Sequence, residues 1–484
     1  MIKLGVLSRI IFKCQAFRNT SETCGAHKCG VGPGSGLFRE RPKIMYAYHD
    51  DLARLIRDCW PTAAEDRIEE GQIPAVPLPA PPFFENLLSI CYQASMLREE
   101  ERPVILRILL AGPELFSNQG FPPTGLHRLV FSKPRPCNET ELKKLSPAVN
   151  FARSLVGVTL SQEGEWQIWG LVHSGTRWLQ HHHGGRKVPP DFPNAPVIWI
   201  RGPGRLTVLR GIESLATLTE GRIITPAISV FESIWLREYF GLAQHEWPEM
   251  YLTLWEQQDW HTVIDPNLPG IIVRQAIMRI ISTMREAHKG GTIIILPHER
   301  RNEFTSRNPL LNIKYQFKED ETRYRSLRLM LETLQTLAEE KGDKIDPGKK
   351  LSWQEYIASD SQKLSSLEEA WFELSHQAAD FAMVDGAVVL TKGSCMLGFG
   401  GMILGDYDQV TTVARALDIE GKHRQEELTE NVGARHRSVY YLCHQVPEAL
   451  GIVISQDGNA RFIKFKDGQV TYWEQAISFA LKIS

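Results

Sequence analysis

Cysteine is scarce in this sequence. Eight cysteines occur among 484 residues, and most stand singly between apolar neighbours. Small secreted domains that depend on disulfides carry a much higher density of cysteine. The composition therefore excludes a disulfide scaffold, and we expect the protein to work in the reducing cytoplasm.

Long hydrophobic runs are also missing. The most apolar stretch, 271–281, is interrupted by Arg274, Gln275 and Arg279, whereas a membrane-spanning helix needs about 18 consecutive apolar residues. Basic residues are not in excess either, because 55 lysines and arginines stand against 57 acids. We therefore expect neither a membrane nor a nucleic acid as partner. What remains is the composition of a folded globular protein, long enough for two to four domains.

Residues 1–44 differ from the rest of the chain. They hold eight basic residues against two acids and end in a glycine-rich run at 30–36. We expect a basic flexible extension, or a misassigned start with Met45 as the true initiator.

Two groups of residues have the chemistry of metal ligands. Cys24, His27 and Cys29 lie close together, but no second pair follows at a zinc-finger spacing. The run 181–183 consists of three histidines in a loop flanked by glycine and proline. Consecutive side chains seldom converge on one ion, so we interpret this run as a solvated loop.

Residues 45–225 predict a mostly antiparallel α+β domain. Helices are expected at 50–59 and 84–98, and turns at 162–164 and 202–204 join neighbouring strands into hairpins. The expected strands are 104–110, 155–160, 166–172, 197–200 and 206–209. A helical connector follows at 226–270.

The remaining residues, 271–480, alternate between helical and strand patterns. Helices are expected at 271–287, 327–338 and 364–381, the first of them closed by Lys289-Gly290-Gly291 with glycine as the cap. Strands are expected at 292–296, 383–390 and 398–404, followed by a meander at 451–455, 461–465 and 470–473.

Asp385 and Gly386 lie in the otherwise apolar segment 383–390. A carboxylate and a glycine inside a buried strand are costly, so a functional reason is plausible. The structural alternative is a turn or bulge at the start of the strand. An aspartate at this place suits a divalent cation or proton acceptance from a hydroxyl, and Gly386 allows a nucleotide to approach the backbone.

The segment 433–438 opens a predicted helix that runs through Cys443. Unpaired N–H groups and the helix dipole favour negative charge at such a start. The guanidinium groups of Arg435 and Arg437 match phosphate oxygens two at a time, so they suit a polyphosphate. The alternative is a basic helix start that is exposed to solvent.

Asp385-Gly386-Ala387 and Arg435-His436-Arg437, 50 residues apart, resemble the DGA and RHR motifs of the DAC-domain diadenylate cyclases. The surroundings resemble the family too: the helix and strand within 271–296, the helix before Asp385, and Ile-Val-Ile-Ser-Gln-Asp-Gly at 452–458. The upstream domain resembles the sensor domain, called DACNV, that is attached to one branch of these cyclases.

The resemblance implies a fold and a reaction. The fold is a C-terminal DAC domain at 271–480, with a central mixed β-sheet flanked by helices and an insertion at about 300–363. The reaction condenses two ATP into cyclic di-AMP and two pyrophosphates with Mg²⁺ or Mn²⁺. Two domains must self-associate face to face, so that each 3′-hydroxyl reaches the other α-phosphate. The N-terminal domain would regulate the reaction through an unknown ligand.

The resemblance also assigns roles to individual residues. Catalysis falls to Asp385, Arg435 and His436, and metal binding to Asp385, His436 and Asp457. Nucleotide binding falls to Gly386, Ala387, Gly433, Arg435, His436, Arg437, Ser438 and Ser455.

Two departures from the family pattern leave a rival hypothesis open. Ala434 stands where many members have threonine, and Gln456-Asp457 stands where many have two glutamates. Losing one charge-stabilising contact costs about 3 kcal/mol, about a hundredfold in rate. The alternative is therefore a nucleotide-binding sensor with a DAC fold and no turnover. A DNA-scanning protein is disfavoured, since no helix-hairpin-helix pattern follows residue 440.

Overall fold

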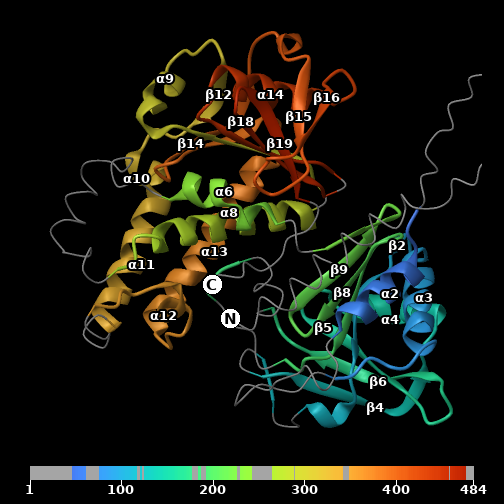
Figure 1. Ribbon diagram of the computed structural model, residues 1–484. Coiled ribbons are helices and arrows are strands. Elements are labelled where there is room, and N and C mark those ends of the chain that lie inside the picture. The colour runs from blue at the N-terminus through green and yellow to red at the C-terminus, as the bar shows by residue number, and fades with distance from the viewer. Residues whose placement is uncertain are drawn as a thin grey trace, which may run out of the picture. The chain divides into compact units, whose positions relative to one another are not determined.

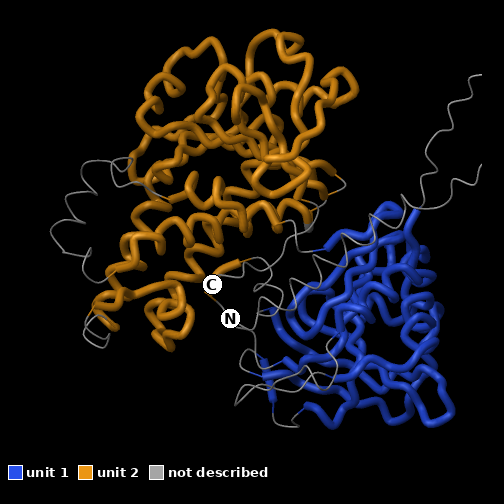
Figure 2. Tube along the Cα trace, in the orientation of Figure 1, with its two compact units in different colours: residues 1–176, 190–227 blue, residues 177–189, 228–484 orange. Residues whose placement is uncertain are grey.

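The computed structural model divides the chain into two compact units, which are coloured separately in Figure 2. The first unit comprises residues 1–176 and 190–227, and the second comprises 177–189 and 228–484. The structure describes residues 46–60, 76–116, 120–122, 125–176, 184–186, 192–225, 229–241, 264–287, 289–341, 348–456 and 458–475. Both groups of candidate metal ligands, at 24–29 and 181–183, lie outside the described residues, as do 242–263 of the expected helical connector.

The first unit combines a large sheet with short helices (Figure 1). Its helices are α2 (His49–Cys59), α3 (Phe83–Ser95), α4 (Glu139–Leu145) and the 3-10 turns η1 (Pro113–Leu115) and η2 (Ser146–Ala148). Its strands are β1 (Arg98–Glu99), β2 (Arg102–Pro103), β3 (Ile105–Leu110), β4 (His127–Pro136), β5 (Ser154–Leu160), β6 (Trp166–His173), β7 (Pro196–Arg201), β8 (Leu206–Arg210), β9 (Glu213–Thr219) and β10 (Arg222–Ile224).

Eight of these strands form one sheet in the order β10-β9-β8-β7-β3-β5-β6-β4. Strands β3 and β5 run parallel, whereas the other neighbours are antiparallel. Leu52 and Ile56 of α2 and Leu87 of α3 share a core with residues of this sheet. Their spacing places them on the inner face of each helix. The mostly antiparallel α+β architecture predicted for this part of the chain is confirmed.

The second unit is larger and is built on a mixed sheet. Its strands are β11 (Gly291–Leu296), β12 (Leu311–Gln316), β13 (Ala387–Thr391), β14 (Met396–Ile403), β15 (Thr412–Ala416), β16 (Arg424–Leu428), β17 (Leu450–Ile454), β18 (Ala460–Lys466) and β19 (Gln469–Gln475). Its helices are η4 (Val230–Glu232), α6 (Ile234–Phe240), α8 (Leu268–Glu286), η7 (His298–Arg300), α9 (Arg301–Thr305), α10 (Asp320–Arg323), α11 (Arg325–Lys341), α12 (Trp353–Ile357), α13 (Gln362–Ala382), η9 (Tyr407–Gln409) and α14 (Ala434–Gln445).

The nine strands are ordered β12-β14-β13-β11-β17-β18-β19-β15-β16, and helices cover both faces. Along β11, Ile293 and Ile295 pack with residues of α8 and α6, whereas Ile294 and Leu296 pack in a second core that includes residues of α14. A strand that is buried on both faces needs an uninterrupted apolar sequence. This explains the run Thr292–Leu296.

Two local predictions are wrong. The strand predicted at 383–390 begins only at Ala387, so Asp385 and Gly386 lie in a turn between α13 and β13, which is the structural alternative named for them above. The turn avoids the cost of placing a carboxylate inside a buried strand. The predicted glycine cap of α8 is also incorrect, because the helix ends at Glu286 and its C-cap is Ala287 in the right-handed helical region.

No helix within the described ranges combines the length and the apolar character needed to cross a lipid bilayer. Cys91, Cys137, Cys395 and Cys443 are buried thiols without disulfides. Burial raises the pKa of the Cys137 thiol to about 12, so this residue stays protonated and inert at neutral pH.

His298 makes the stability of the second unit depend on pH. Its ring is 4% exposed, and its Nδ1 lies 2.9 Å from the Thr391 hydroxyl. Burial, aided by the nearby Arg301, lowers the pKa of His298 to about 4, whereas histidine in an unfolded chain has a pKa of about 6.5. Below that pH the unfolded state binds a proton that the folded state does not. The unit should therefore lose stability as the pH falls from about 6.5 towards 4.

The variant His298→Asn removes this titration. We expect it to be less stable than the wild type at neutral pH, with a gap in melting temperature that narrows as the pH is lowered to 5. Scanning calorimetry of both proteins across this range checks the expectation. A gap that stays constant with pH would show that His298 does not titrate in this way.

Candidate functional site

The register of three central strands brings distant segments to one edge of the second sheet. Strand β11 pairs in parallel with β13, with Thr292 opposite Ala387. It pairs antiparallel with β17, with Gly291 opposite Ile454. The residues just before β11, just before β13 and just after β17 therefore lie at the same edge. These are Gly290, the turn with Asp385 and Gly386, and Ser455.

Arg435, in the first turn of α14, reaches the same edge. A Cβ atom added at Gly290 would lie 2.5 Å from Nη1 of Arg435 and 3.5 Å from the backbone nitrogen of Gln456. The guanidinium group therefore lies directly over Gly290, beside the end of β17. Arg435 and Asp385 are both exposed. Neither side chain makes an ion pair or hydrogen bond with another residue that the structure describes.

Gly386 is required by the backbone at this edge. Its φ angle is +105°, in the region that favours glycine. A Cβ atom here would lie 2.6 Å from the carbonyl carbon of Gly400 and 2.9 Å from the nitrogen of Gly401. Ala387, which opens β13, pairs with Gly401 and is buried. The turn that carries Asp385 is thus pressed closely against β14.

The start of α14 leaves backbone N–H groups available to an anion. Gly433 is the N-cap and has no side chain to accept from them, and the first turn contains no acidic residue. The N–H groups of His436 and Arg437 donate to the carbonyl oxygen of Gly433, whereas those of Ala434 and Arg435 donate to no residue that the structure describes. A helix start of this kind, with Arg435 beside it, favours negative charge.

The other predicted residues of α14 are placed differently. Nη1 of Arg437 lies 3.1 Å from a carboxylate oxygen of Asp408, on η9, so this guanidinium already has a partner. The Ser438 hydroxyl donates to the backbone oxygen of Arg435. The ring of His436 faces Tyr440, with 6.4 Å between ring centroids.

Partly buried polar contacts fix α14 against the sheet. Arg461 of β18 donates to the Tyr440 hydroxyl at 3.1 Å and pairs with Glu474 at 2.9 Å. Burial raises the pKa of Tyr440, which keeps the phenol neutral. Sequence reasoning missed Arg461 and Asp408, since neither belongs to a recognisable motif. It also missed the role of Gly290, although its position before an apolar strand was a usable signal.

Ser455 closes a turn, because its backbone N–H and its hydroxyl both donate to the carbonyl oxygen of Asn459. Asp457, a predicted metal ligand, lies outside the described residues. Within the described ranges, no three histidine, cysteine or acidic side chains gather as a metal site.

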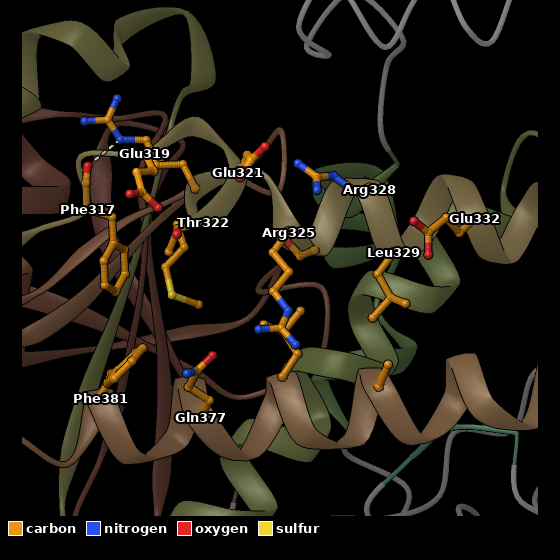
Figure 3. Close-up of a pocket in the computed structure, with 15 residues that line it drawn as sticks. Phe317, Glu319, Glu321, Thr322, Arg325, Arg328, Leu329, Glu332, Gln377 and Phe381 are labelled. Atoms are coloured by element: carbon orange, nitrogen blue, oxygen red, sulfur yellow. Dashed lines mark hydrogen bonds between the residues drawn. The ribbon is translucent and has the colours of Figure 1, made fainter.

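A cavity of about 590 Å³ lies elsewhere in the second unit, between α11 and α13. Figure 3 shows Phe317 and Phe381 at one end of it, and Arg325 facing Gln377 across it. None of the predicted site residues lines this cavity. Asp385 and Arg435 are instead exposed side chains at the sheet edge described above.

The chain was compared with known families, curated proteins and solved structures. Residues 73–173 match the family described as "probable sensor domain DACNV". The match runs from just before α3 to the last residue of β6, within the first unit. No curated protein and no solved structure matches the chain.

Gly290 offers a direct test of the site. Gly290→Ala would place a methyl group against the Arg435 guanidinium and force it to move. The neighbouring backbone oxygen of Ile454, 3.0 Å away, needs to shift by only a few tenths of an ångström. A hydrogen bond to a charged group contributes about 1.5–3 kcal/mol. If this edge binds ATP, as the family resemblance implies, we expect ATP affinity to fall about tenfold or more, with a nearly unchanged melting temperature.

Titration of ATP by calorimetry, with Arg435→Ala for comparison, measures this effect. The two variants should lose affinity to a similar degree. Wild-type affinity in both would mean that Arg435 does not contact the nucleotide.

Proposed function

We propose that the second unit is a diadenylate cyclase, which condenses two ATP into cyclic di-AMP and two pyrophosphates under the control of the first unit. The observation that carries this proposal is the convergence of Asp385, Gly386, Arg435 and Ser455 at one sheet edge. These residues come from the two motifs and the strand end that resemble the DAC family. Their meeting point combines a carboxylate and a guanidinium that pair with no residue the structure describes, together with a helix start that favours anions.

Each of these groups suits one part of the reaction. The Asp385 carboxylate would accept the proton of a ribose 3′-hydroxyl as its oxygen forms a bond to the α-phosphorus of the other ATP. The bond between the α- and β-phosphates breaks, and pyrophosphate leaves. Arg435 and the N–H groups at the start of α14 would hold the phosphate oxygens on which charge accumulates. Such a reaction depends on positioning and charge neutralisation rather than on a covalent enzyme intermediate.

The exposure of Asp385 and Arg435 supports a dimeric site. Both side chains would be accessible to a nucleotide bound by one protomer and to a second protomer that faces it. A second protomer facing the first would bring the two nucleotides together and exclude water from them. We therefore propose that the active form is a symmetric pair of second units, each binding one ATP.

The donor set fits a hard divalent cation that arrives with ATP. Magnesium in phosphoryl-transfer sites is held by one or two carboxylates together with the substrate phosphates, and Asp385 supplies one exposed carboxylate. A bound Mg²⁺ or Mn²⁺ would neutralise phosphate charge. His436 and Asp457 stay proposals as further ligands.

The match of residues 73–173 to a sensor-domain family supports regulation by the first unit. In the family resemblance this sensor domain accompanies DAC domains, so the two lines of argument agree. The ligand of the first unit and the direction of its control are open to experiment.

A second candidate function is a nucleotide-binding sensor without turnover. Ala434 removes a hydroxyl at the helix start, and Gln456 replaces a carboxylate beside Ser455. ATP binding without product would favour this candidate, and restoring glutamate at 456 and 457 would then be the informative change.

The variant Asp385→Asn tests the cyclase directly. It keeps the size of the side chain but removes the proton acceptor, so we expect cyclic di-AMP synthesis to fall at least about a hundredfold. The purified protein is incubated with ATP and Mn²⁺ or Mg²⁺, and the product is measured by mass spectrometry. Asp380→Asn, at another exposed aspartate at the end of α13, is the matched control and should retain full activity. Equal activity of Asp385→Asn and wild type would refute the role of Asp385.

Dilution tests the dimeric site. If two protomers form each active site, specific activity should fall as the protein is diluted below its dimer dissociation constant. Activity assays and light scattering over the same concentration series compare the specific activity with the fraction of dimer. Specific activity that stays constant while the protein becomes monomeric would contradict a shared site.

A further inference from the structure

Three residues of the connection between β6 and β7 pack against helices of the second unit. Strands β6 and β7 belong to the first unit, but residues 177–189, which connect them, belong to the second (Figure 2). Of this connection the structure describes Gly184, Gly185 and Arg186, here called the anchor segment. It begins eleven residues after His173, where both β6 and the sensor-domain match end.

Arg186 is the centre of the anchor segment. Its side chain is buried, and every nitrogen of its guanidinium group donates a hydrogen bond. Nε donates to the carbonyl oxygen of Tyr356, Nη1 to the hydroxyl of Ser365, and Nη2 to the carbonyl oxygen of Ser359. The group also lies 5.3 Å from the centre of the Tyr356 ring. Arg186 thus joins α12 to the first turn of α13.

The two glycines of the anchor segment fit where no side chain could. Gly185 has a φ angle of +103°, and a Cβ atom there would lie 2.1 Å from a carboxylate oxygen of Glu368. Its N–H donates to the side chain of Gln275 on α8 at 2.9 Å. At Gly184, φ is +96°. The backbone of the anchor segment therefore packs closely against α8 and α13, in an arrangement that only glycine allows.

The anchor segment contacts a buried ion pair. Arg279 of α8 and Glu368 of α13 lie 2.6 Å apart and are 3% and 4% exposed. The same guanidinium donates to the carbonyl oxygen of Gly184, and the Glu368 carboxylate accepts from the N–H of Arg186. The anchor segment therefore forms hydrogen bonds with both members of the ion pair that joins α8 to α13.

Helix α13 links this contact to the candidate site. Glu368 lies near its start, and its last residue, Ala382, precedes Asp385 by three positions. Shifts of packed helices by about 1–2 Å are one way in which a change at one site reaches another. A shift at the first turns of α13 would reach its end in this way. The alternative is that the anchor segment is a purely structural contact that transmits no movement to α13.

We propose that the anchor segment couples the first unit to the catalytic face. A displacement of β6 and β7 would move Arg186, Arg186 would shift α12 and α13, and α13 would shift the turn that carries Asp385. The coupling itself does not depend on the reaction, but its role as the control of cyclic di-AMP synthesis rests on the proposed function.

A double-mutant cycle followed by hydrogen–deuterium exchange of the full chain tests the coupling. Val172→Ala loosens β6, where Val172 is fully buried, and Ile168→Val is the milder second variant on the same strand. With Arg186 present, either change should speed exchange in α12 and the first half of α13 about threefold or more. In an Arg186→Ala chain, exchange there should already be about tenfold faster, and the β6 changes should add nothing.

Arg210→Ala is the matched control, because it removes an arginine that pairs with Glu213 within the first unit; it should leave α12 and α13 unchanged. The proposal is overturned if loosening β6 does not alter α12 and α13 while Arg186 is present, or alters them equally without it. It is also overturned if Arg186→Ala leaves their exchange unchanged. Hydrogen–deuterium exchange is measured without substrate, so this test does not depend on catalysis. If the chain makes no cyclic di-AMP, the proposed function is refuted, but the exchange results still test the coupling.

Discussion

The pairing of β11 with β13 on one side and β17 on the other places the functional side chains of the second unit. Parallel pairing sets the starts of β11 and β13 side by side, and antiparallel pairing adds the end of β17. A slip of one residue would turn Ile293 and Ile294 to the opposite faces. Both faces of β11 are buried under helices, which hold the strand in place between its neighbours. The register of the two pairings places the site residues.

Helix α13 connects this sheet edge to the buried ion pair of Arg279 and Glu368. Removing one partner of such a pair costs about 3–5 kcal/mol, because the other charge stays buried without compensation. Each partner thus depends on the other at the contact between α13 and α8, and the anchor segment with Arg186 adds hydrogen bonds at the same place. The end of α13 thereby presents Asp385 from a well-supported helix, as a site that depends on positioning requires.

Much of the fold could be predicted because the relevant signals are local. Apolar runs and turn residues predicted β11, the β5–β6 hairpin and the final meander, and the basic run at 434–437 predicted the start of α14. Asp385 was placed in a strand because apolar neighbours conceal a turn, which depends on the close approach of Gly386 to Gly400. The contacts of Arg186 could not be predicted, since they join residues 170 or more positions apart and no sequence periodicity indicates them.

Isotope mixing tests the central claim, that two ATP molecules meet at the face with Asp385 and Arg435. The full chain is incubated with equal amounts of unlabelled and uniformly ¹³C-labelled ATP, and the mass of the cyclic dinucleotide is measured by mass spectrometry. The account predicts light, mixed and heavy product in the ratio of one to two to one, with two pyrophosphates released for each product. ATP that binds but yields no cyclic dinucleotide, even at protein concentrations that favour the dimer, would contradict it.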